Sequence, residues 1–339
     1  MRALVIPLLF LCCLMLAFVY VLVNTPYVLN TMLVDVINDH AKGFVLEEFH
    51  CARQKGRLPD VVSIFDVTMK IRQGERVYDI EADEIVIQNF FEFVKKQELL
   101  RLAARGIVLK TGNIDVQEGQ IKAVIRLSDF KILFMETMAF AKEFQFGPYL
   151  FSEISTHIKG NPSKIEIYEM KGSAYGGTVS GQLTFDQVPE FNYVLWSEFD
   201  GIETRQIAQV YPMPFGKMEG RFGGSMRLVG GKEADIFAVM LSAKEGLTIS
   251  PALFLQVSGI FDETEKAEVT RLSDQGKTLI AQTATLHIQN GRAGKILLVF
   301  DIQEAVNHFV LKGSVPVDWP GRLETFLFPQ RQSQSQPQQ

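Results

Sequence analysis

Apolar and polar residues alternate over most of the chain that follows residue 43. In Ser63–Ile71, apolar side chains at positions 65, 67, 69 and 71 are separated by the polar residues Asp66, Thr68 and Lys70. A half-buried β-strand has this period of two, because successive side chains point to opposite faces of the sheet. The alternation returns at 121–127, 179–185, 222–228, 286–288 and 309–317. The pattern predicts a protein built mainly of β-strands.

Turn sequences separate these runs, and they favour antiparallel pairing of consecutive strands. They are Gln73-Gly74, Glu118-Gly119, Gly176-Gly177, Gly230-Gly231 and Asn290-Gly291. We expect about 16 strands between Gly43 and Phe328. The expected fold class is therefore all-β, with antiparallel neighbours.

A few other elements interrupt the alternation. Apolar residues mixed with lysines predict a helix at about Phe90–Arg105, and a shorter one is expected at Ile202–Val210. Slips in the alternation at Asp83–Ile85 and near Asp129 predict bulges or corners. The body at 43–329 is one β-rich domain or two subdomains divided near Phe146-Gly147-Pro148.

The first 24 residues predict a retained transmembrane signal anchor. Residues 3–23 carry no charge, and a helix of that length spans about 31 Å, the thickness of a bilayer core. Arg2 on one flank, with no basic residue until Lys42 on the other, favours translocation of the bulk of the chain. Tyr20 and Tyr27 stand where aromatic residues meet the membrane interface.

Residues 25–42 are expected to form an amphipathic connector helix, lying on the membrane or closing one end of the domain. The last segment, 330–339, consists almost entirely of Gln, Ser and Pro and is expected to be a disordered tail.

The charge of the chain and its lack of catalytic motifs argue against several classes of function. The net charge of −5 and the scattered Lys and Arg residues form no basic face, so nucleic acid is not an expected partner. The five histidines have no metal-ligand spacing, and neither a GxSxG elbow nor a phosphate-binding glycine loop occurs. Cys51 lacks any surrounding Cys/His signature. We expect no catalytic residues, no metal and no cofactor, and hence no enzyme.

Two glycine-punctuated stretches carry a resemblance to a known family. Ser173–Asp186 contains Tyr175-Gly-Gly-Thr-Val-Ser-Gly181, and after a short predicted helix Gly216–Gly231 repeats glycines through an alternating strand. This order, followed by the strand Thr283–Gly291 and preceded by a signal anchor, resembles the AsmA-like family. The likeness touches both ends of the chain, and the middle matches by strand pattern only.

The resemblance implies a bacterial envelope protein in the inner membrane, single-pass, with the bulk of the chain in the periplasm. The family's long curled antiparallel sheet, the β-taco, has an apolar inner face thought to conduct phospholipid towards the outer membrane. This chain is short for the family, since about 16 strands spaced 4.8 Å apart extend only some 75 Å. Other envelope proteins extending the groove, oligomerisation or a local role would then be needed.

Membrane and phospholipid are thus the expected partners, and the apolar alternating positions are the candidate groove residues. They are Phe65, Val67, Met69, Ile71, Val179, Leu183, Phe185, Phe222, Met226, Leu228, Leu286, Ile288, Phe309 and Leu311. The same alternation also fits two sheets packed into a closed sandwich. In that alternative the protein is an envelope scaffold or an assembly factor for outer-membrane proteins, without lipid transport.

Overall fold

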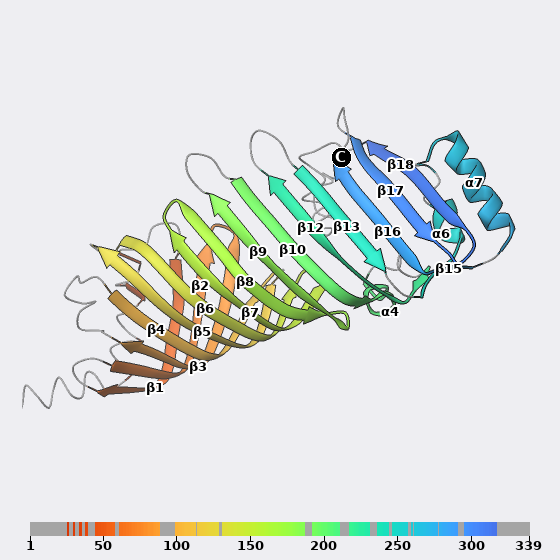
Figure 1. The fold of residues 1–339 in the computed structure, drawn as a ribbon. Helices are drawn as coiled ribbons and strands as arrows, with labels where there is room; N and C mark the ends of the chain where they lie inside the picture. Colours follow the sequence, from red (N-terminus) through yellow and green to blue (C-terminus); the bar gives the residue numbers. More distant parts are fainter. Residues whose placement is uncertain are drawn as a thin grey trace, which may run out of the picture. The chain divides into compact units, whose positions relative to one another are not determined.

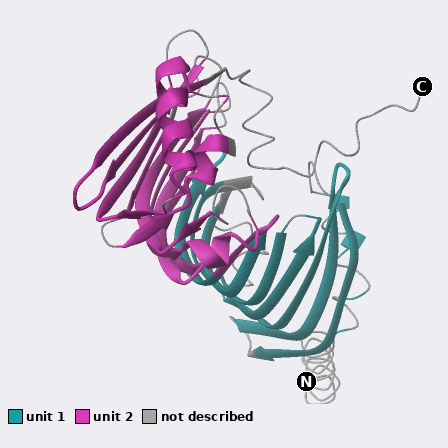
Figure 2. Ribbon diagram, turned by 90° about the vertical axis from the view of Figure 1, so that its right-hand side faces the viewer, with its two compact units in different colours: residues 1–146, 152–162 teal, residues 147–151, 163–339 magenta. Residues whose placement is uncertain are grey.

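The structure of the chain is a computed structural model. It describes residues 26, 30, 34–35, 38–39, 45–57, 61–88, 99–112, 114–128, 131–186, 192–210, 217–230, 236–243, 246–256, 259, 261–276, 278–290 and 295–316. The chain divides into two compact units, unit 1 at 1–146 with 152–162 and unit 2 at 147–151 with 163–339 (Figure 2). One division lies between Phe146 and Gly147, near the position where the sequence allowed a boundary between two subdomains.

Unit 1 is a run of long strands. They are β1 (Val45–Arg57), β2 (Val61–Gln73), β3 (Arg76–Gln88), β4 (Leu99–Thr111), β5 (Ile114–Ser128), β6 (Lys131–Phe146) and β7 (Tyr149–Asn161), whose first three residues belong to unit 2.

The described residues of unit 2 form strands and three short helices. Its strands in the large sheet are β8 (Lys164–Ala174), β9 (Gly177–Asp186), β10 (Asn192–Glu203), β12 (Arg221–Gly230), β13 (Ile236–Ala243), β16 (Thr283–Asn290), β17 (Lys295–Gln303) and β18 (His308–Pro316). The remaining elements are α4 (Thr204–Ile207), β11 (Met218–Glu219), β14 (Leu247–Ile249), α6 (Ala252–Gln256), α7 (Glu263–Asp274) and β15 (Leu279–Ala281).

Fifteen strands form one large sheet in the order β1 to β10, then β12, β13, β16, β17 and β18 (Figure 1). Antiparallel pairing joins β1 with β2, β2 with β3, β4 with β5, β8 with β9 and β9 with β10, as the turn sequences predicted. The described residues therefore confirm the all-β class, with 18 strands against the expected 16 or so.

In the described part of the chain, two excursions from this sheet are seen, both in unit 2. After β10 it forms α4 and β11, and after β13 it forms β14, α6, α7 and β15 before returning as β16. The strands of these excursions pair as a separate three-stranded sheet, β11-β14-β15. Unit 2 therefore has a second layer, made of the segments that interrupt its sheet.

Strands of unit 1 bend along their length, as Figure 2 shows. Asp66, Glu118 and Glu153 adopt positive φ angles of 51°, 49° and 52°, and Gly106 has a φ of 64°. The register between β4 and β5 shifts between Arg105 and Leu109, beside Glu118. Such irregular residues bend a strand and change which side chains face a given side.

The predicted helix at Phe90–Arg105 is wrong over residues 99–105. Leu99–Thr111 is instead strand β4, hydrogen-bonded to β3 on one side and β5 on the other. Leu, Ala and Arg favour helices in isolation, but two backbone ladders outweigh that local preference. Residues 90–98 lie outside the described ones.

The shorter helix is confirmed only at its centre. Ile202 and Glu203 still belong to β10, and the helix is α4, Thr204–Ile207. A register shift between Arg126 and Leu127 confirms an irregularity next to Asp129. At Asp83–Ile85 the alternation slips by one residue, as predicted, because Ala82 and Ile85 both belong to the same apolar cluster. The pairing with β2 and β4 is interrupted at Asp83, and the register is the same on either side of it.

The predicted anchor at 1–24, with Arg2 and Tyr20, lies outside the described residues, and so do Tyr27 and the tail at 330–339. In the described part of the chain, no helix has both the length and the apolar character needed to cross a bilayer. Within the predicted connector, Asn30, Val34, Asp35, Asn38 and Asp39 are helical.

Candidate functional site

One face of the unit 2 sheet is apolar across all of its later strands. Residues that lie directly opposite one another form a continuous cross-strand row. The row consists of Val179, Phe199, Gly224, Leu241, Leu286, Phe300 and Leu311. Directly opposed side chains on one face are in contact range, so the row forms an apolar band across seven strands.

Gly224 is the member of the band on β12, and it contributes no side chain. A Cβ atom there would lie 2.1 Å from the carbonyl oxygen of Met240 and 3.0 Å from the ring of Phe199. The Phe199 ring instead occupies the space over the glycine and meets Phe222 edge to face, with ring centroids 6.0 Å apart. The glycine-rich strand thus serves close packing of aromatic rings.

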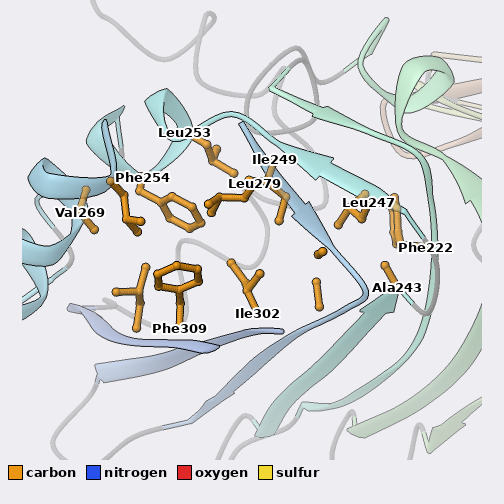
Figure 3. Close-up of a cluster of buried hydrophobic side chains, with 14 of the residues drawn as sticks. Phe222, Ala243, Leu247, Ile249, Leu253, Phe254, Val269, Leu279, Ile302 and Phe309 are labelled. Carbon is orange, nitrogen blue, oxygen red and sulfur yellow. The ribbon is translucent and has the colours of Figure 1, made fainter. Parts of the chain in front are cut away.

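The second layer covers part of this face and makes a closed core. Phe254 of α6 is buried and points toward the strands that carry Ile302 and Phe309 (Figure 3). Its ring lies 5.8 Å from that of Phe300, edge to face. Val269 and Leu272 of α7 and Leu247 and Ile249 of β14 complete the same cluster.

A cavity of about 250 Å³ lies between the second layer and the sheet face. Phe222, Leu286 and Ile288 line it from the sheet, and Leu247 and Phe254 line it from the second layer. Among the described residues that line it, all side chains are apolar except the hydroxyl-bearing Ser242 and Thr285. With no charged group among these described residues, the cavity suits a hydrocarbon ligand better than a polar one.

Unit 1 also has an apolar sheet face. One cross-strand row consists of Phe49, Met69, Ile80, Leu109, Val116 and Phe144. Its buried cluster contains Cys51, Val62, Ile64, Val67, Ala82 and Ile107. Every member of this cluster comes from strands of the sheet itself, and the described residues of unit 1 include no second layer.

The structure places the predicted groove residues as follows. Five are buried: Val67, Phe222, Leu228, Phe309 and Leu311. Nine are half-buried: Phe65, Met69, Ile71, Val179, Leu183, Phe185, Met226, Leu286 and Ile288. Phe222, Leu286 and Ile288 line the cavity together, and Phe309 and Leu311 belong to the closed cluster beside it.

Phe65 differs from its neighbours, because it lies on the charged face of unit 1. Its cross-strand row is Arg53, Phe65, Glu84, Arg105, Gln120 and Phe140. Arg53 lies over the Phe65 ring at 4.5 Å, and Arg105 pairs with Glu84 at 2.8 Å. The positive φ of Asp66 inverts the alternation, so Ile64 and Val67, three residues apart, are both buried.

The sequence prediction missed much of the cavity wall. Phe300 and Leu298 lie within Lys295–Gln303, where a nearly continuous apolar run hides the alternation. Leu247 and Ile249 alternate around Thr248 over only three residues, too few to predict a strand. Phe254 lies in a five-residue helix, and no local pattern ties it to a strand 46 residues later.

Two described titratable groups near these faces have shifted pKa values. Burial raises the pKa of the Cys51 thiol, which keeps it protonated and unreactive at neutral pH. Hydrogen bonds from Arg221 and Gln206 lower the pKa of Glu203, which holds the end of β10 to β12. Within the described ranges, no three His, Cys, Asp or Glu side chains gather as a metal site would require.

Comparisons of the chain with protein-family models, with curated proteins and with solved structures gave no match. The resemblance to the AsmA-like family therefore stays a prediction from the sequence motifs.

Proposed function

We propose that the protein binds phospholipid by taking its acyl chains onto the apolar sheet face and into the unit 2 cavity. The observation that carries this proposal is the cavity itself, whose wall is apolar on both the sheet and the second layer. Acyl chains gain free energy on leaving water for such a wall, by about 25 cal/mol for each Å² of buried apolar surface. The headgroup would stay in water.

Half-buried rows outside the cavity extend the apolar surface within each unit. In unit 2, Met226, Val239, Ile288 and Leu298 form a second apolar row beside the band that contains Leu286. In unit 1, the row from Phe49 to Phe144 is apolar at every position. These rows support conduction of acyl chains along the apolar face of each unit.

The cellular setting is part of the same proposal and rests on the sequence. A charge-free segment at 3–23 would anchor the protein in the inner membrane of a bacterium, with the bulk of the chain in the periplasm. Lipid carried there would serve outer-membrane biogenesis. The proposal involves no catalytic step, no metal and no cofactor.

The closed core of unit 2 favours a second candidate, an envelope scaffold or assembly factor for outer-membrane proteins. Phe254, Val269 and Leu272 belong to a buried cluster with residues of the sheet, as in a protein with a closed hydrophobic core. In that case the cavity would be a packing defect, and no lipid would occupy it.

Mass spectrometry of the purified full-length chain separates the two candidates. The protein, purified in mild detergent, is extracted with organic solvent, and its phospholipid content is compared with that of two variants. Leu286→Trp fills the cavity, whereas His287→Trp places the same side chain at an exposed neighbour on the opposite face. We expect bound phospholipid in the wild type and in His287→Trp, and a loss of at least half in Leu286→Trp.

Circular dichroism and thermal unfolding confirm that each variant is folded before its lipid is measured. Equal lipid in all three proteins would place the lipid elsewhere and refute the cavity. A folded wild type without lipid would leave the scaffold as the better account.

A further inference from the structure

Each strand of the second-layer sheet in unit 2 joins a strand of the large sheet at the same end. β11 runs through Gly220 into the start of β12, and β15 runs through Gln282 into the start of β16. β13 ends at Ala243, from which the chain leads to Leu247 of β14. Because β13 is antiparallel to β12 and β16, its end lies beside their starts. The two layers therefore converge beside Ala243 (Figure 3).

The cavity between the layers is closed at this joined end. Ala243 lies directly opposite Ala284, which lies opposite Ile302, and all three line the cavity. Their exposures are 5%, 8% and 2%. Four residues further along the strands, Ile288 and Leu298 also line the cavity, and both are only half-buried. The cavity is thus blind at the alanines and more accessible at Ile288.

Two measures of this space agree on a single hydrocarbon chain. Ala284 and Ile288 are four residues apart on β16, which is about 14 Å along a strand. An extended hydrocarbon advances about 1.25 Å per carbon, so about eleven carbons span that length. An apolar cavity of about 150 Å³ holds one benzene molecule of about six carbons, so 250 Å³ has room for roughly ten. Two chains of that length do not fit.

We propose that the cavity is a blind-ended slot for one acyl tail of about ten carbons, whose methyl end lies against Ala243 and Ala284. The tail enters past Ile288, and a second tail of the same phospholipid stays outside on the apolar sheet face. This inference rests on the proposed function and adds to it the number of inserted tails, their direction and a length limit. The slot is an end point for the tail, beside the apolar rows that lie outside it.

The test measures binding of single-tailed lysophosphatidylcholines to the full-length chain in mild detergent. Their tails range from about 6 to about 16 carbons, which brackets the proposed limit. Native mass spectrometry gives the number of lipids bound per chain and the fraction of chains that carry one. Each variant is compared with the wild type at the same tail length, so partition of the lipid into detergent micelles cancels. We expect one bound lipid per chain.

Two variants act on opposite ends of the slot. Ala284→Leu shortens the slot from its closed end, so it should bind the shortest tails like the wild type. It should bind tails of about ten carbons or more at least 10-fold more weakly, because each methylene left outside costs roughly 4-fold in affinity. Ile288→Trp blocks the entrance and should weaken tails of every length alike.

Matched controls place the same side chains at exposed neighbours on the same strand. They are Thr283→Leu and His287→Trp, and both should bind like the wild type. Circular dichroism and thermal unfolding show whether each variant is folded. Ala243→Leu, which fills the same closed end, replaces Ala284→Leu if that variant is not folded.

Three results would overturn the inference and leave the proposed function standing. They are two lipids bound in the slot, an effect of Ala284→Leu that does not depend on tail length, and a loss in Ile288→Trp that is confined to long tails. A wild type that binds no lysophosphatidylcholine of any length would overturn the inference and the proposed function together.

Discussion

Unit 1 and unit 2 present the same kind of apolar sheet face but cover it differently. In unit 2, Phe254 and Val269 from the second layer are almost completely buried against the sheet, at 1% and 0% exposure. In unit 1, Ile80, Ile85 and Ile121 of the sheet face are only half-buried, and the buried cluster contains strand residues alone. The difference comes from the excursions that follow β10 and β13, which the strands of unit 1 lack among the described residues.

The comparison shows that an alternating strand does not by itself indicate a closed core. Leu286 and Ile80 have the same local pattern of apolar and polar neighbours, yet only Leu286 faces a second layer. Among the described residues, the sheet face of unit 2 is partly covered and that of unit 1 is not. The predictions that follow test how far the two faces differ.

The largest effect is expected from truncating matched phenylalanines in the two units. Phe254→Ala should lower the free energy of unfolding by about 3–5 kcal/mol, because it empties a closed core. Phe49→Ala in unit 1 removes a half-buried ring and should cost about 1–2 kcal/mol. Urea denaturation of both variants measures the two losses. Equal losses would mean that the face of unit 1 is covered as fully as that of unit 2.

A smaller effect is expected at the start of α7, which carries part of the second layer. The carboxylate of Asp262 accepts hydrogen bonds from the N–H groups of Thr264 and Glu265 at 3.0 and 3.1 Å. Asp262→Ala should cost about 1 kcal/mol of stability, as the loss of a helix N-cap usually does.

The control for this variant is Asp274→Ala in the last turn of the same helix, where a carboxylate opposes the helix dipole. It should be neutral or slightly stabilising in the same denaturation assay. A neutral Asp262→Ala would show that α7 adds little to the closed core.

The smallest expected effect is a pH dependence of stability at the ion pair of Glu203 and Arg221, which joins the end of β10 to the start of β12. Arg221 lowers the pKa of Glu203, so the pair stabilises the fold above the carboxyl's unfolded pKa of about 4.3. This contribution is lost as the pH falls through the lowered pKa of the folded state. Arg221→Gln should therefore reduce Tm slightly at pH 7, and the difference from the wild type should shrink toward zero in acid.

Thermal scans between neutral and acid pH measure this convergence. Arg227→Gln, an exposed change on the same strand, should show no such pH dependence. A constant difference between wild type and Arg221→Gln across the range would rule out Glu203 as its source.

Part of the candidate site could be read from the sequence. Phe222, Leu286 and Ile288 were predicted from alternation and do line one cavity. Phe254 and Leu247 were not predicted, because their contacts with the sheet depend on how the chain folds back after β13. Phe65 was predicted on the same face as Val67, and the left-handed backbone of Asp66 places it on the other.

The sequence by itself determined that this protein is an antiparallel β-protein, because period-two alternation and glycine turns are local properties of neighbouring residues. Only the tertiary structure decided which alternating positions are covered. It made residues 99–105 a strand, since β3 and β5 both pair with them. It also placed Asn30 and Asn38 on the edge of β1, because hydrogen bonds between distant segments leave no period in the sequence.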